Sequence, residues 1–115
     1  LPWQGDSMDL VHTGCLGAAV DLDSGMACAR SCVLNGLSVL EDALGDLDQI
    51  QRVIKVVGFV ASAPGFSDQP AVIDAASGLL IDVFGELGRH ARSAVGVAEL
   101  PRGAPVEIEL VVRCH

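Results

Sequence analysis

The sequence predicts an α+β sandwich, in which a β-sheet carries two helices on one of its faces. Two segments have apolar residues at helical spacing, an almost continuously apolar segment lies between them, and two short alternating segments close the chain. A chain of 115 residues is long enough for a single domain, taken here as residues 1–115. Half of the residues are apolar but few are aromatic, so we expect a core of aliphatic side chains.

The first helix is predicted from about Ser24 to Leu44. Asp21 or Asp23 can cap its start, and Gly45 offers a left-handed stop at its end. Its apolar residues recur every three or four positions, which places them on one buried stripe. They are Leu22, Met26, Ala29, Val33, Leu37, Leu40 and Leu44.

A strand is predicted from about Ile50 to Ala61, where Lys55 is the only charged residue after Arg52. Both faces of this strand are therefore mostly apolar, and each needs cover from water. Two helices can cover one face. We expect the other face to be covered by another subunit.

The second helix is predicted from about Gln69 to Leu87, with Ser67 or Asp68 as its cap. Gly78 and Gly85 weaken a helix, so we expect close packing or a bend at these two positions. The apolar stripe consists of Val72, Ala76, Leu79, Val83 and Leu87.

The last quarter of the chain is predicted to be a β-hairpin with a Pro/Gly turn. Arg92 stands at the start of its first strand. On the second strand Glu107 and Glu109 share one face and the apolar residues share the other. The arginine and Glu107 together suggest a clamp for a carboxylate beside a base.

Composition excludes several function classes. The formal net charge is -8, which argues against nucleic acid as a partner because such binding depends on neutralising phosphates. The apolar runs are too short to cross a bilayer, and no secretory signal is visible. We therefore expect a cytoplasmic protein without membrane or nucleic-acid partners, in which arginines of the last quarter form at most a local anion site.

The cysteines allow two interpretations. Cys28 and Cys32 are four residues apart and could form half of a metal site completed by Cys15 and His12. Alternatively, they are small apolar side chains on a packed helix face. No second closely spaced pair exists to complete a zinc tetrahedron, so we expect packing and no metal.

Two runs in the last quarter, RSAVGVAELPRG (92–103) and VEIE (106–109), closely resemble the C-terminal motif of the YjgF/Rid family, also called the endoribonuclease L-PSP family. The resemblance extends to ASAPGFSDQP (61–70) and GELGRH (85–90), which are similar to a longer bacterial subgroup. It implies a chorismate-mutase-like fold, a homotrimer and ligand clefts between subunits. It also implies that the family's Ser-Gly-Gln signature and its first one or two strands are absent from this chain.

The resemblance further implies a RidA-like enzyme, a hydrolase similar to 2-iminobutanoate/2-iminopropanoate deaminases, that needs no cofactor. Such an enzyme converts small 2-imino acids into 2-oxo acids and ammonia. The arginine matching Arg92 holds the substrate carboxylate, and the glutamate matching Glu107 positions or activates a water. Ala94 belongs to the same substrate-binding motif.

Two departures from the family pattern favour an alternative function. Ala94 stands where the deaminases usually carry a cysteine, and the chain contains no tyrosine. The alternative is a trimeric protein that binds a small carboxylate such as a 2-oxo acid without turnover. Other roles also stay open: an interface salt bridge for Arg92, a solvated position for Glu107, and either a ligand contact or a surface loop for His90. The chain lacks the basic groove that a nuclease would need.

Overall fold

The computed structural model describes residues 1–4 and 9–115. Within these residues the chain forms two long helices and three strands, together with short 3-10 helices. In order these are α1 (Leu22–Leu44), η1 (Leu47–Gln49), β1 (Ile50–Ala61), α2 (Gln69–Phe84), η2 (Gly85–Gly88), β2 (Ala91–Val97), η3 (Pro101–Gly103) and β3 (Val106–Cys114).

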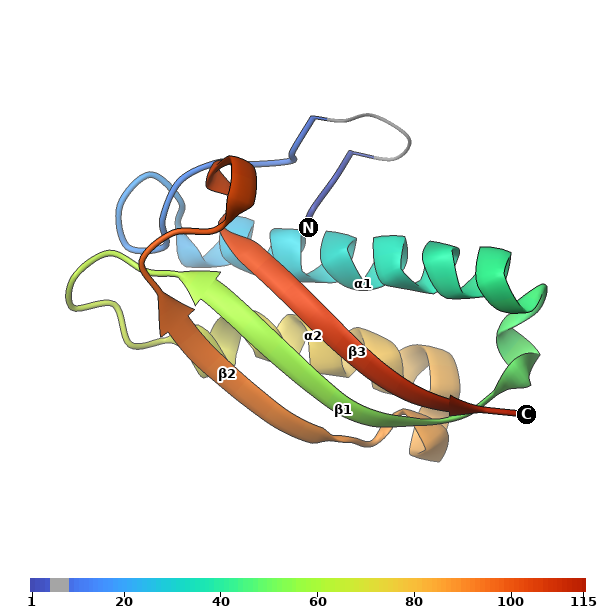
Figure 1. The fold of residues 1–115 in the computed structure, drawn as a ribbon. Helices are drawn as coiled ribbons and strands as arrows, with labels where there is room; N and C mark the ends of the chain where they lie inside the picture. Colours follow the sequence, from blue (N-terminus) through green and yellow to red (C-terminus); the bar gives the residue numbers. More distant parts are fainter. Residues whose placement is uncertain (5–8) are drawn as a thin grey trace.

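The strands form one mixed sheet in the order β2-β1-β3, with β1 in the centre (Figure 1). β2 pairs with β1 in parallel, and β3 pairs with β1 antiparallel on its other side. In register, Val56 lies between Arg92 and Leu110. The predicted hairpin is therefore wrong. Alternation shows which residues share a face of a strand, but it does not show which strand is the partner.

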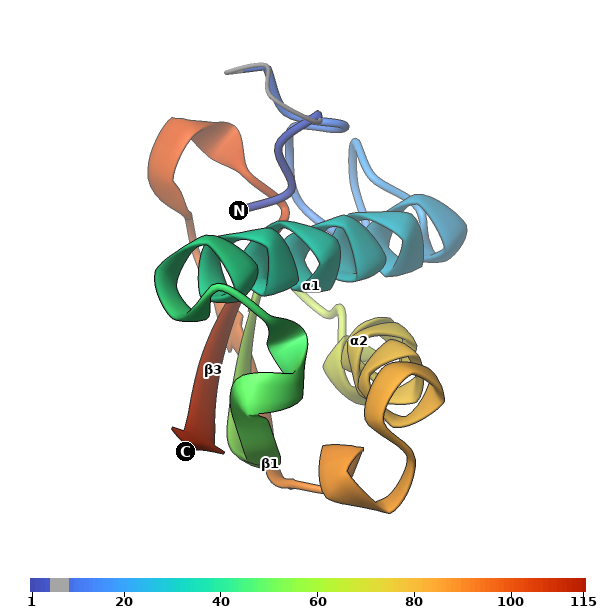
Figure 2. The same cartoon turned by 90° about the vertical axis from the view of Figure 1, so that its right-hand side faces the viewer.

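Both helices lie on the same face of the sheet, as the two perpendicular views show (Figures 1 and 2). This confirms the predicted sandwich. Along β1 the buried residues Val56, Gly58 and Val60 alternate with half-buried residues. Since Ile73 of α2 reaches Gly58, this buried set faces the helices.

The helix ends follow the local sequence closely. The side chain of Asp21 accepts a 2.8 Å hydrogen bond from the backbone N–H of Ser24, which caps α1. Gly45, with φ of 85°, ends α1 in the left-handed conformation. α2 ends at Phe84, three residues before the predicted end at Leu87, because Gly85 with φ of 61° turns the chain into η2.

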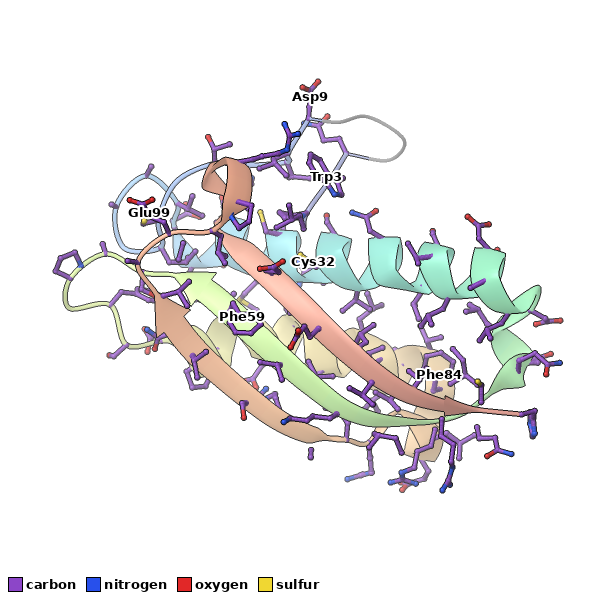
Figure 3. All side chains as sticks on the ribbon, in the orientation of Figure 1. Trp3, Asp9, Cys32, Phe59, Phe84 and Glu99 are labelled. Atoms are coloured by element: carbon purple, nitrogen blue, oxygen red, sulfur yellow. The ribbon has the colours of Figure 1, made fainter. Side chains whose placement is uncertain are left out.

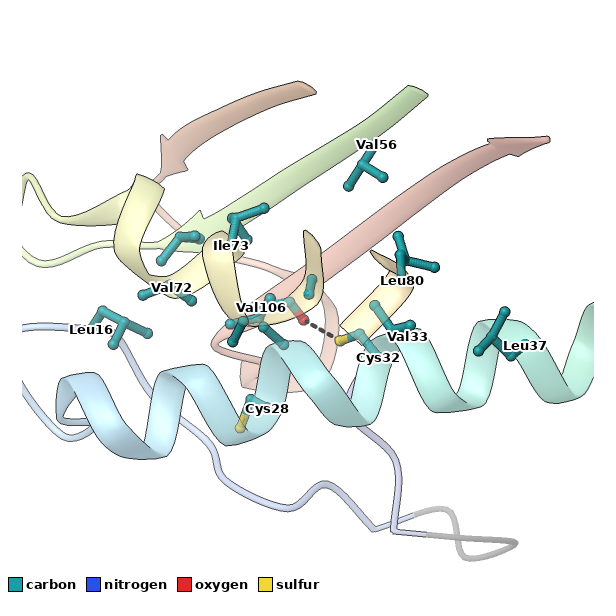
Figure 4. Packing of buried hydrophobic residues seen from close by; sticks show 14 of the residues in the cluster. Leu16, Cys28, Cys32, Val33, Leu37, Val56, Val72, Ile73, Leu80 and Val106 are labelled. Atoms are coloured by element: carbon teal, nitrogen blue, oxygen red, sulfur yellow. Dashed lines mark hydrogen bonds between the residues drawn. The ribbon is translucent and has the colours of Figure 1, made fainter. Parts of the chain in front are cut away.

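The buried core lies between the sheet and the two helices (Figure 4). Cys28 and Cys32 are part of it, which confirms the packing interpretation of these thiols. The Cys32 thiol donates to the carbonyl oxygen of Val106 at 3.7 Å. Gly58 lets α2 approach β1, because a Cβ there would overlap Cγ1 and Cδ1 of Ile73. Gly78 has open space around its Cα, so close packing does not explain that glycine.

Residues 1–3 contact both α1 and η3. The amide of Asn35 donates to the carbonyl oxygens of Leu1 and Trp3, at 3.2 and 3.1 Å. The Arg102 guanidinium lies over the Trp3 ring, 5.8 Å from its centroid. In residues 1–4 and 9–115, neither helix is both long and apolar enough to cross a membrane.

Candidate functional site

Arg92 lies on the edge strand β2, on the face of the sheet that carries the helices. Its Nη1 donates to Oδ1 of Asp74 on α2 at 2.6 Å and to Oγ of Ser77 at 3.5 Å. The side chain of Arg92 is 27% exposed and that of Asp74 is 66% exposed. The pair is therefore partly screened by solvent and contributes little to stability. It does hold the guanidinium in one place at the rim of the sheet.

Only one end of the guanidinium is used by these contacts. Nη1 makes both hydrogen bonds, whereas Nε and Nη2 have no hydrogen-bond partner among the described residues. Nε and Nη2 form the side edge of the group, which matches the two oxygens of a carboxylate. Arg92 can thus bind a carboxylate through two parallel hydrogen bonds without releasing Asp74.

Ser77 connects Arg92 to His90, the residue just before β2. The Ser77 hydroxyl is 2.9 Å from Nε2 of His90, and Nδ1 of His90 is 2.5 Å from the carbonyl oxygen of Gly88. Because a carbonyl only accepts, a neutral His90 carries its proton on Nδ1. Its Nε2 then accepts from the Ser77 hydroxyl, whose oxygen faces the arginine. His90 is therefore half-buried and hydrogen-bonded rather than free in a surface loop.

Ala94 shares the helix-facing side of β2 with Arg92, two residues further along. It lies in register with Gly58, is half-buried and packs against the core. Its methyl group offers no hydrogen-bonding atom, so any polar contact at this position must come from the backbone.

Glu107 lies elsewhere in the protomer. It is half-buried on the edge strand β3 and pairs in register with Phe59. Phe59 points to the uncovered face of the sheet, the side toward the viewer in Figure 3. Arg92 and Glu107 thus occupy opposite faces, on edge strands about 10 Å apart across β1. One protomer does not bring these two predicted site residues together.

The two buried cysteines, Cys28 and Cys32, are not suited to a metal or redox site. Burial raises the pKa of Cys32 to about 12, and burial also raises the pKa of Cys28. Both thiols therefore stay protonated at neutral pH and are poor ligands and nucleophiles. Within residues 1–4 and 9–115, no three side chains of His, Cys, Asp or Glu converge as metal ligands would.

A small cavity of about 140 Å³ lies at the other end of β2, beyond its last residue. Cys15, Ala61, Glu99 and Ala104 are among its lining residues. The Cys15 thiol contacts the carbonyl oxygen of Ala98 at 3.8 Å. Ala98 is six residues from Arg92, about 20 Å along an extended strand, so this cavity is separate from the arginine site.

The sequence predicted Arg92 as an anion-binding residue but gave no indication of its neighbours. Asp74 and Ser77 lie on α2, three residues apart and off the buried stripe. Polar residues at such positions usually face solvent, and only the parallel pairing of β2 with β1 brings the arginine beside them.

Similarity to known proteins covers nearly the whole chain. Residues 3–108 match the family described as "YjgF/chorismate mutase-like, putative endoribonuclease". Protein TCP17 of Trypanosoma cruzi is 52% identical over 104 residues, which are 90% of this chain and 65% of that protein. The chain thus spans about two thirds of the length of this curated relative.

Two crystal structures show the same architecture. The Agrobacterium tumefaciens protein Atu1372, of unknown function, is 46% identical with a TM-score of 0.95, over 99% of this chain and 71% of that one. The YjgF gene product of Escherichia coli is 24% identical with a TM-score of 0.56, over 84% of this chain and 71% of that one, and it supports the fold alone. From the matched sequence and the shared sandwich, this chain belongs to the YjgF/chorismate mutase-like family.

Proposed function

We propose that this protein binds small 2-imino or 2-oxo acids in a cleft between subunits, with Arg92 as the carboxylate anchor, and that it hydrolyses the imino acids. The observation that carries this proposal is the geometry of the guanidinium. Asp74 and Ser77 hold its Nη1, and its Nε and Nη2 stay available to a carboxylate. Bidentate arginine–carboxylate pairs are among the stronger hydrogen-bonded contacts in proteins.

The position of Glu107 supports a site between subunits. A reaction centre that includes both Arg92 and Glu107 requires Glu107 from a second copy of the chain, because the two lie on opposite faces of one sheet. The uncovered face also carries apolar side chains, with Val95 42% and Val111 51% exposed. Burying this face in a homotrimer would remove that apolar surface from water.

The proposed reaction is hydrolytic deamination. Arg92 holds the carboxylate of the imino acid, and the Glu107 carboxylate of the second copy takes a proton from a water as the water oxygen bonds to the imine carbon. The carbon–nitrogen bond of the resulting adduct then breaks. Glu107 passes the proton that it took to the imine nitrogen, and the hydroxyl proton of the adduct also moves to this nitrogen as the bond breaks. Ammonia thus leaves with both protons of the water, and the carbon keeps the water oxygen as the carbonyl of a 2-oxo acid.

One observation favours binding without turnover as a second candidate function. Ala94 packs its methyl group against the core and offers no side-chain polar atom next to Arg92. A protein that holds a 2-oxo acid through Arg92 alone would need nothing more at this position.

Carboxylate binding is tested by titrating pyruvate into the purified protein by calorimetry. We expect Arg92→Ala to weaken binding by about 10- to 100-fold, because hydrogen bonds to a charged group contribute about 1.5–3 kcal/mol. Arg89→Ala is the matched control, since Arg89 is exposed and pairs only with Glu86 in the described structure. Equal pyruvate affinity of Arg92→Ala and the wild type would rule out the anchor.

Turnover and assembly are measured separately. Ammonia release from 2-aminoacrylate, generated from serine by a dehydratase, should be accelerated by the wild type and lost in Glu107→Gln. If the protein binds pyruvate but does not accelerate ammonia release, the deaminase function is refuted and the carboxylate-binding function is supported. Light scattering should give a mass of three chains, and a stable monomer would contradict a cleft between subunits.

A further inference from the structure

Arg92 is surrounded by three polar residues to which neither the sequence motif nor the proposed reaction assigns a role. We propose that Asp74, Ser77 and His90 are positioning residues, which orient Arg92 so that its Nε and Nη2 receive the carboxylate of a small 2-oxo or 2-imino acid. The inference rests on the proposed role of Arg92 as the carboxylate anchor. The positioning residues would make the site specific for a carboxylate that binds to the Nε–Nη2 edge of the guanidinium.

Asp74 supplies the first constraint. An arginine at the rim of a sheet has many accessible rotamers, and ordering such a side chain on binding costs affinity. The 2.6 Å contact between Asp74 Oδ1 and Arg92 Nη1 orders it beforehand. The contact uses one nitrogen only, so the carboxylate of Asp74 does not occupy the edge that a ligand would use.

Ser77 and His90 supply the second constraint. Each hydrogen bond of the chain runs in the same direction: Arg92 Nη1 donates to Ser77 Oγ, the Ser77 hydroxyl donates to His90 Nε2, and His90 Nδ1 donates to the Gly88 carbonyl. Hydrogen bonds aligned in this way polarise and strengthen one another. The serine oxygen is thereby held with a lone pair directed at the arginine.

The end of this chain of hydrogen bonds is packed against α2, the helix that carries Ser77. Gly88 is buried, and a Cβ there would overlap the carbonyl oxygen of Leu80 in α2. The carbonyl that orients His90 is therefore packed against the same helix that carries Asp74 and Ser77. This close approach makes the whole arrangement a rigid frame around one guanidinium.

The three residues act through Arg92 rather than on the ligand. Asp74 and Ser77 contact Nη1, which lies away from the Nε–Nη2 edge. A carboxylate bound at that edge would not meet the serine hydroxyl. These residues are expected to set affinity and orientation, and not to exchange protons with the substrate.

The test measures the pyruvate dissociation constant of the protein by calorimetry for paired variants. Ser77→Ala should weaken binding about 3- to 10-fold, whereas Ser77→Thr, which keeps the hydroxyl, should stay within about twofold of the wild type. Asp74→Ala should weaken binding more than Asp74→Asn, which keeps an acceptor oxygen. Ser38→Ala is the matched control, because Ser38 is an exposed serine on α1 and belongs neither to α2 nor to the uncovered face of the sheet.

A second readout reports the hydrogen-bond direction and does not depend on a ligand. At a pH at which the ring is neutral, the ¹⁵N chemical shifts of His90 should place its single proton on Nδ1. A proton on Nε2 would reverse the bond to Ser77 and overturn the proposal. Asp74→Asn alters an exposed side chain, so it is expected to fold even if a change at Ser77 does not.

Each result separates the inference from the proposed function. If Arg92→Ala abolishes pyruvate binding while Ser77→Ala and Asp74→Ala do not change it, the anchor stands and the positioning role is refuted. If Asp74→Ala tightens binding, Asp74 competes with the ligand and the positioning role is also refuted. If Arg92→Ala itself has no effect, the proposed function has failed.

Discussion

The contact between β1 and α2 depends on the missing side chain at Gly58, and replacing this glycine tests how α2 is positioned. A Cβ at residue 58 would overlap Cγ1 and Cδ1 of Ile73. Ile73 is fully buried, so it has no solvent-exposed rotamer to escape to. Gly58→Ala therefore forces either a strained Ile73 rotamer or a shift of α2 away from the sheet.

The cost can be bounded from this geometry. Overpacking a well-filled core by one methyl costs about 1–3 kcal/mol. The lower entropy of alanine in the unfolded chain offsets about 0.5–1 kcal/mol of that loss. The net loss is thus at most about 2.5 kcal/mol, and we expect Gly58→Ala to lower the free energy of unfolding by about 1–2 kcal/mol, near the middle of the range. Ile73→Ala alone should lower it by about 2–5 kcal/mol, because it opens a cavity.

The double variant tests whether the overlap with Ile73 causes the loss of stability in Gly58→Ala. In Gly58→Ala/Ile73→Ala the new methyl enters space that Ile73 has left, so the combined loss should be about 1–3 kcal/mol smaller than the sum of the single losses. Urea denaturation followed by far-UV circular dichroism gives the three free energies. Losses that add to within about 0.5 kcal/mol would refute the overlap. Asp74 follows Ile73 on α2, so Gly58→Ala should also weaken pyruvate binding.

The remaining predictions concern the thiols, the cap of α1 and the uncovered face. Cys114 is exposed and should react with a chromogenic disulfide reagent in the native protein, whereas Cys32, whose pKa burial raises to about 12, should react only after unfolding. The hydrogen bond from Ser24 lowers the pKa of Asp21 in the folded state, so its stabilising effect is present above the ordinary carboxyl pKa of 3.8 and is lost as pH falls through the folded-state value. The difference in melting temperature between wild type and Asp21→Ala should therefore shrink in acid, and a difference that is constant with pH would contradict the cap. Val95→Asp should convert the proposed trimer into monomers in light scattering, whereas Leu34→Asp on α1 should leave the mass unchanged.

Much of the secondary structure could be predicted because its signals are local. The bounds of β1 agree with the prediction, and α1 ends where Gly45 can adopt a positive φ. The burial of Cys28 and Cys32 also follows from their spacing on one helix face. The end of α2 was harder to place, since the apolar stripe continues through η2 and only the backbone at Gly85 ends the α-helix.

The site was predictable only in part. The motif around Arg92 predicts an anion-binding residue there and a base at Glu107, and both roles stay predictions. Their separation could not be seen in the sequence, because it depends on β2 and β3 pairing with opposite sides of β1. The expected hairpin would have placed the two strands side by side.

The sequence by itself determined where the helices and strands lie and most of the residues that they bury, although Val83 and Leu87 of the expected stripe are exposed. It also predicts that Arg92 holds a carboxylate, and this role stays a prediction. These properties follow from periods of two and 3.6 residues, from capping residues and from side-chain chemistry, all of which act over short distances along the chain. Tertiary structure decided which strands pair and which side chains meet. Asp74 lies 18 residues from Arg92, and only the packing of α2 against a parallel β1–β2 pair brings its carboxylate to the guanidinium. The antiparallel pairing of β3 with β1 sets Glu107 opposite Phe59, on the other face of the sheet, because strand partners are chosen by contacts between distant segments.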